Sequence, residues 1–135
     1  MMKMEFKKNK SGQLDGKLVA VHKKFLQKAK KANWLAAIML MTEANHRCPI
    51  DTGALSGHVY VLPNNPALIN TIIFLEPYAA RVHEGSKSDG YGSGTRSIAR
   101  AHEFGVKVGP KFLTRAWKEE RKKIEARIMQ HVRFQ

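Results

Sequence analysis

The pattern of hydrophobic and polar residues changes near position 48. Before it, apolar residues recur at steps of three and four from Leu14 to Met39, the spacing that lines one face of an α-helix. This pattern predicts one helix from Lys17 to about His46, with Asp15 as its N-cap. Pro49 has no backbone N–H and disfavours helical geometry in the residue before it, so the helix is expected to end there.

The second half of this helix has a different character from the first. From Trp34 to Met41 it is apolar on every side, so it needs cover on more than one face. Either a sheet and another helix of the same chain supply both covers, or a neighbouring subunit supplies one of them. In the second case, Trp34 and Met41 lie in a subunit interface.

Downstream of Pro49, the pattern is that of strands and short turns. His58 to Leu62 and Ala67 to Leu75 are predicted to form an antiparallel hairpin with a largely buried second strand, joined by the turn residues 63–66. Tyr78 to Glu84 is expected to form a helical turn or two against the sheet. Val106 to Val108 is expected to form a short closing strand.

A last helix is predicted to open at Gly109 and Pro110 and to pack across the sheet, alongside the first helix. Glu119 and Lys123 have the spacing of a favourable ion pair on it. Its apolar stripe is Leu113, Trp117, Ile124, Ile128 and Val132. The predicted fold is therefore α+β, with two helices on a small, mostly antiparallel sheet of three to five strands. We expect one domain over residues 1–135, with residues 1–14 as a flexible arm or an edge strand.

The corner after the first helix has a structural and a chemical interpretation. Its residues are Pro49, Asp51, Thr52, Gly53 and Leu55. The Asp51 carboxylate is expected to accept a backbone hydrogen bond from Gly53 or the next residue, as in an N-cap or Asx-turn. Asp-Thr-Gly is also the core of aspartic proteases, which need two such carboxylates. The chain has one copy, and Pro49 disfavours the strand that precedes this motif in those enzymes.

Three segments together carry a resemblance to a known family. They read Pro-Ile-Asp-Thr-Gly-Ala-Leu at 49–55, Pro-Tyr-Ala-Ala-Arg-Val-His-Glu-Gly at 77–85 and Gly-Pro-Lys-Phe-Leu at 109–113. In this order and spacing, the chain from about Trp34 to Lys123 resembles the tail-completion or neck proteins of tailed bacteriophages, which are also described as head–tail joining or minor capsid proteins.

The resemblance implies a structural protein without enzymatic activity or cofactor. It implies a homo-oligomeric ring, with a hexamer favoured, that completes the tail and joins it to the head-closure or portal complex. The implied partners are those proteins and the tail-tube or tail-terminator proteins, with non-specific contact to DNA in the channel and no membrane. The implied location is the neck of the virion, after assembly in the host cytoplasm.

The net charge of +13 is unevenly distributed. Residues 1–33 and 107–135 carry the whole of this excess, whereas the middle of the chain is close to neutral. The lysines chosen as candidates for contact with a polyanion or an acidic partner are Lys23, Lys24, Lys28, Lys30 and Lys31. A basic excess favours polyanions, so a nucleic-acid-binding protein is the alternative function. A solvated helix face that serves only solubility explains the same lysines.

The segment from Gly85 to Ser97 is rich in glycine and serine and is expected to be a loop, either ordered against a neighbour or simply disordered. Its interface candidates are Gly85, Lys87, Tyr91 and Arg96. The loop lacks the spacing of a P-loop, which disfavours a phosphate-cradling function.

Two His-Glu pairs, at 83–84 and 102–103, suggest a metal site, but adjacent helical residues diverge too much to hold one ion. The single cysteine excludes an internal disulfide and indicates a reducing compartment. No metal or cofactor is expected.

Overall fold

The structure is a computed structural model that describes residues 16–64 and 67–133. Its helices and strands, in chain order, are α1 (Gly16–Arg47), α2 (Ala54–Gly57), β1 (Val59–Asn64), β2 (Ile69–Phe74), α3 (Ala79–Glu84), a 3₁₀ turn (Lys87–Asp89), α4 (Thr95–Phe104) and α5 (Phe112–Val132). The predicted α+β class is confirmed. The predictions for residues 1–14 and for Asp15 lie outside the described residues.

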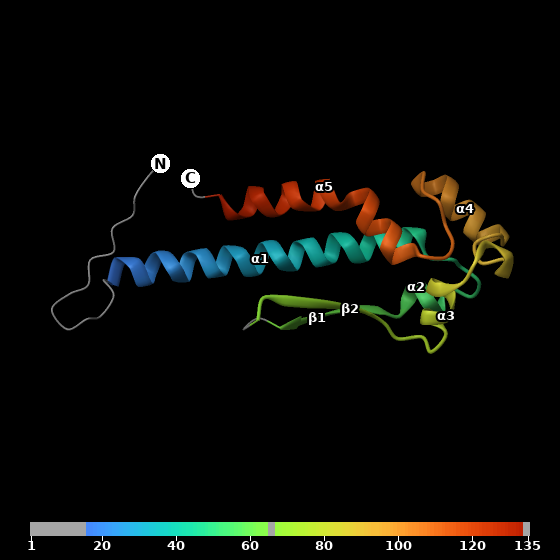
Figure 1. Ribbon diagram of the computed structural model, residues 1–135, viewed down its shortest axis with the longest axis horizontal. Coiled ribbons are helices and arrows are strands. Elements are labelled where there is room, and N and C mark those ends of the chain that lie inside the picture. The colour runs from blue at the N-terminus through green and yellow to red at the C-terminus, as the bar shows by residue number, and fades with distance from the viewer. Residues whose placement is uncertain (1–15, 65–66, 134–135) are drawn as a thin grey trace.

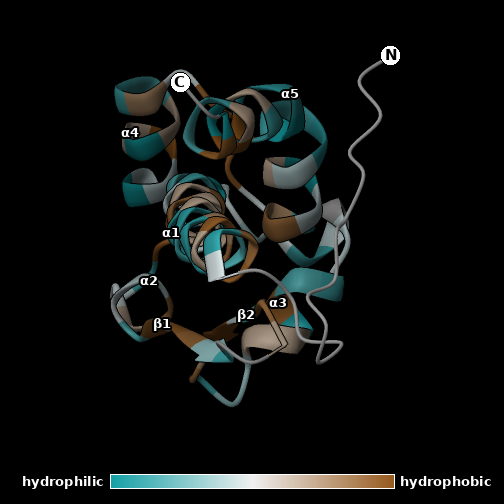
Figure 2. Cartoon of the chain, turned by 90° about the vertical axis from the view of Figure 1, so that its left-hand side faces the viewer, coloured by the Kyte–Doolittle hydropathy of each residue, from teal (hydrophilic) through white to brown (hydrophobic). Residues whose placement is uncertain are grey.

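Helix α1 is the spine of the fold, about 48 Å long at 1.5 Å per residue. Helix α5 runs along one side of it and the β1–β2 hairpin along the other (Figure 1). The end-on view shows the same three layers (Figure 2). Because two elements of the same chain flank its second half, Met41 is half-buried, whereas Trp34 is 38% exposed. The helix ends at Arg47, as Pro49 predicts.

The hairpin pairs antiparallel, with Val59 opposite Phe74 and Asn64 opposite Ile69. Residues alternate between the two faces of a strand, and only the face toward α1 is covered. Tyr60 and Leu62 therefore remain 50% and 55% exposed. The prediction of a largely buried second strand was wrong, since Ile69 is 56% exposed.

The sheet is smaller than predicted. In the described part of the chain it has two strands, not three to five. The segment 106–108 is not a closing strand, because its neighbourhood satisfies backbone groups in other ways: Val106 N–H bonds to the Ala101 carbonyl at 3.2 Å, and Gly109 N–H bonds to the Arg47 carbonyl at 3.0 Å.

Helix α5 begins at Phe112, two residues later than predicted, after Lys111 in the left-handed conformation (φ 57°). It packs along α1 and not across the sheet (Figure 1). Its inward residues are Phe112, Ala116 and Ile124, all buried, whereas Trp117 of the predicted stripe is 41% exposed. The predicted stripe is thus only partly correct, because the face of the helix that packs on α1 carries Ala116 and not Trp117.

Candidate functional site

The three segments that carry the family resemblance meet in one buried cluster. Leu55 comes from the first segment, Ala79 and Val82 from the second, and Phe112 from the third. The rest of the cluster is Ala44, Cys48 and Ala116. The Phe112 ring makes edge contacts with Phe74 and His83, with centroids 5.1 Å and 5.0 Å away. These segments therefore build the hydrophobic core at the end of α1.

The corner itself is formed in a different way than predicted. Gly53 precedes α2 with φ 92°, in the left-handed region that favours glycine. The Ala54 N–H instead donates a hydrogen bond to Thr52 Oγ1, at 3.4 Å. The prediction that the Asp51 carboxylate caps this turn was wrong. Asp51 is exposed, and it is its backbone carbonyl that accepts a hydrogen bond from another part of the chain.

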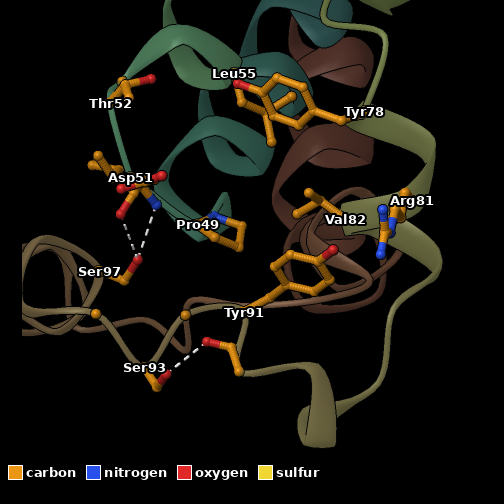
Figure 3. Close-up of a pocket in the computed structure, with 15 residues that line it drawn as sticks. Pro49, Asp51, Thr52, Leu55, Tyr78, Arg81, Val82, Tyr91, Ser93 and Ser97 are labelled. Carbon is orange, nitrogen blue, oxygen red and sulfur yellow. Dashed lines mark hydrogen bonds between the residues drawn. The ribbon is translucent and has the colours of Figure 1, made fainter.

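Helix α4 holds the corner in place through side-chain hydrogen bonds (Figure 3). Ser97 is 1% exposed; its hydroxyl accepts a hydrogen bond from the Ile50 N–H at 2.9 Å and donates one to the Ile50 carbonyl at 3.2 Å. Arg96 donates to the Asp51 carbonyl at 2.9 Å. The sequence assigned both side chains to a loop, but α4 already begins at Thr95. Arg96, expected at an interface, thus has an internal contact.

A pocket of about 650 Å³ lies between the corner, α3 and the glycine-rich loop (Figure 3). Asp51 is the only carboxylate among its lining residues. Aspartic proteases use two carboxylates that share a proton, so protease chemistry would need a second Asp from another copy of the chain. Pro49, Leu55 and Val82 supply apolar walls.

Tyr91 attaches the glycine-rich loop to the body of the protein. Its ring packs against the buried cluster, and a Cβ at Gly85 would lie 2.7 Å from that ring. A Cβ at Gly92 would lie 2.7 Å from the Val108 carbonyl oxygen. Two of the predicted interface residues, Gly85 and Tyr91, therefore serve an internal contact. Lys87 belongs to the 3₁₀ turn, and its side chain lies outside the described residues.

The candidate lysines of α1 differ from one another. Lys23, Lys24, Lys30 and Lys31 are exposed. Lys28 is half-buried and its ammonium group donates to the Arg133 carbonyl, at 3.3 Å, which joins α1 to the end of α5.

An ionic cluster between α1 and α5 was missed by the sequence analysis. The Arg47 side chain is 2% exposed and contacts Glu43 at 2.7 Å, Glu119 at 2.6 Å and Glu120 at 3.3 Å. Burial acts against its charge, but the hydrogen bonds to Glu43 and Glu119 prevail and raise the pKa of Arg47. The predicted Glu119–Lys123 pair is replaced by Lys123–Glu120 at 2.8 Å. Glu43, four residues before Arg47, was the signal available in the sequence.

The two His-Glu pairs each lie at the end of a short helix that a glycine follows, at Gly85 after α3 and at Gly105 after α4. His83 Nδ1 lies 2.8 Å from its neighbour Glu84, which also pairs with Lys111. Within residues 16–64 and 67–133, no three His, Cys, Asp or Glu side chains gather so as to hold a metal ion.

Comparisons with models of protein families, with curated proteins and with solved structures each found no match. Among the described helices, none is both long and apolar enough to cross a membrane.

Proposed function

We propose that this chain is a structural subunit of a tailed-phage neck, which forms a ring that completes the tail and joins it to the head-closure or portal complex. The observation that carries the proposal is the convergence of the three resemblance segments in one core. Residues that are 27 or more positions apart in the sequence, Leu55, Val82 and Phe112, pack together there. Such mutual packing is what three motifs of one shared fold require, whereas chance matches have no reason to meet.

The outer face of the hairpin is suited to contact between subunits. No Asp, Glu, Lys, Arg or His occurs from Val59 to Leu75, in a chain of net charge +13. Tyr60, Leu62 and Ile69 are each at least half exposed on its outer face. Like charges oppose the approach of two basic chains, so an uncharged apolar face is where copies of this chain meet at the lowest electrostatic cost.

The exposed lysines of α1 then have two functions in a neck. They attract acidic neighbouring subunits, and they give a weak, sequence-independent attraction to DNA in the channel. Helix α1 extends beyond the hairpin and presents Lys23 and Lys24 on an exposed face (Figure 1).

The second candidate function is nucleic-acid binding by a monomer. The exposure of Lys23, Lys24, Lys30 and Lys31 along one helix favours it. A duplex-DNA titration at near-physiological salt separates the two functions. For a neck subunit, binding should be weak, independent of sequence and lost as salt rises, with a log–log slope of about −0.9 for each phosphate contact. Nanomolar, sequence-selective binding would identify a DNA-binding protein.

The subunit contact is tested by sedimentation and electron microscopy of the purified chain, alone and with phage tails that lack their completion protein. Leu62→Glu should abolish ring formation, because it places a charge on the uncharged face. Met129→Glu is the matched control, since Met129 is 57% exposed on α5, away from the hairpin. Equal loss of assembly in both variants, or rings formed by Leu62→Glu, would exclude the hairpin as the contact.

A further inference from the structure

A second pocket, of about 710 Å³, lies between the loop at 90–93, the segment 107–111 and the first turns of α5. We call it the α5 pocket. The charged residues that line it are all cations: Lys107, Lys111, Arg115 and Lys118. Lys111, Arg115 and Lys118 follow one another at steps of four and three, so they share one face of the helical turn.

Arg115 is the unusual member of this set. One terminal nitrogen, Nη1, donates to the Lys107 carbonyl at 2.9 Å. Its other two nitrogens, Nε and Nη2, are shielded from solvent and have no hydrogen-bond partner in the described structure. Buried donors on a charged group are costly when they remain unpaired. Burial is also the main reason why the pKa of Arg115 lies below its usual value.

Glu119, which acts on Arg115 electrostatically, does not satisfy its unpaired donors. It lies one turn further along α5, but its Oε2 accepts a hydrogen bond from Arg47 Nε at 2.8 Å and lies 2.6 Å from Arg47 Nη2. Arg47 shows what a buried guanidinium requires in this protein, namely several carboxylate oxygens within hydrogen-bond distance. Arg115 is only partly buried, but its Nε and Nη2 have no such partner in the described structure.

We propose that the α5 pocket binds a phosphate group, with Arg115 and Lys118 as its main ligands. A guanidinium fork and an ammonium group together suit a tetrahedral anion with several acceptor oxygens. Gly109 has φ 144°, and a Cβ there would already lie 3.7 Å from Arg115 Nη2. Lys111 pairs with Glu84 and is therefore not counted among the main ligands.

The phosphate comes either from the free anion or from the backbone of a nucleic acid, and the inference does not depend on the neck assignment. The test measures heat of binding and thermal unfolding of the full chain in sodium phosphate and in sodium chloride at matched ionic strength. The variants are Arg115→Gln and Lys118→Gln, with Lys122→Gln as a control of equal charge change at an exposed position of α5 outside the pocket.

Phosphate should bind and stabilise the unmodified chain more than chloride does. Arg115→Gln should weaken phosphate binding by about tenfold or more, the effect of losing one charge-assisted hydrogen bond. Lys118→Gln, which changes an exposed side chain, should weaken it less, and Lys122→Gln should leave it unchanged. If Arg115→Gln does not fold, the comparison of Lys118→Gln with Lys122→Gln decides.

A short DNA duplex distinguishes the two sources. Displacement of phosphate by the duplex, and loss of that displacement in Lys118→Gln, indicate a nucleic-acid backbone; phosphate binding that the duplex does not affect indicates the free anion. Equal effects of phosphate and chloride, or equal losses in Lys118→Gln and Lys122→Gln, would show only screening of a basic chain and would overturn the proposal.

Discussion

The Arg47 cluster should respond very differently to removal of its cation and removal of its anions. The Arg47 side chain is 2% exposed, whereas Glu43 and Glu119 are 30% and 47% exposed. If Arg47 is lost, the carboxylates can regain water. If the carboxylates are neutralised, the guanidinium remains buried with too few partners, and that state is the more costly one.

The magnitudes follow from this exposure. Glu119→Gln with Glu120→Gln leaves Arg47 with one carboxylate, Glu43, and should lower the free energy of unfolding by about 3 kcal/mol, the lower end for a broken buried ion pair. Arg47→Met keeps most of the buried volume and should cost only about 1–2 kcal/mol. The matched control is Arg121→Met, which removes an ion pair whose partners are 60% and 50% exposed and should have the smallest effect of the three.

Urea unfolding followed by circular dichroism measures these differences, with the slope checked for a common unfolding transition. The expected order of destabilisation is the double glutamine variant first, then Arg47→Met, then Arg121→Met. If Arg47→Met costs more than the double variant, the buried cation is not the group that controls this cluster, and the reasoning fails.

Three further predictions concern the loop, the core and the ionic cluster. Gly92→Ala should lower the free energy of unfolding by about 1–3 kcal/mol, because Gly92 has φ 92° and the added Cβ would lie 2.7 Å from a carbonyl oxygen. Gly57→Ala is the control: it has open space around it and should change the free energy of unfolding by no more than about 0.5 kcal/mol. Equal costs would contradict the packing described for the loop. Burial raises the pKa of Cys48 to about 12, so a thiol reagent near pH 8 should label it only as fast as the chain unfolds; rapid labelling without urea would show an open core. Lys123, together with Arg47, holds the pKa of Glu120 below its usual value of 4.5. The stabilisation that Glu120 contributes is therefore complete above pH 4.5 and is lost as pH falls through the folded-state pKa of Glu120. Glu120→Gln should flatten the fall in stability below about pH 4, and an unchanged acid profile would show that Glu120 does not cause this fall.

The sequence was most informative where the local pattern and the tertiary environment agree. The first helix was predicted to end near His46 and ends at Arg47, because its periodicity is long and Pro49 stops it for a covalent reason. The hairpin was found for a similar reason, since residues 63–66 separate two apolar runs. Both depend on residues close in sequence.

The errors come from contacts between distant residues. The prediction of an Asp51 cap was wrong because Arg96, 45 positions later, orients this corner through a hydrogen bond to the Asp51 carbonyl. The side chain that accepts the backbone hydrogen bond is that of Thr52. Glu43 indicated an ion pair with Arg47 but not the burial of Arg47, because its other two carboxylate partners lie on α5. The loop boundary was misplaced because Ser97, a polar residue, is buried by its bonds to Ile50.

The most direct test of the neck proposal is electron microscopy of phage tails that lack their completion protein, before and after addition of the purified chain. A neck subunit should add a ring at the head-proximal end of the tails and allow them to join heads, and Leu62→Glu should abolish both effects while Met129→Glu preserves them. Tails that remain unchanged in the presence of folded protein, with nanomolar sequence-selective binding of the same protein to duplex DNA, would contradict the proposal and favour the nucleic-acid-binding function.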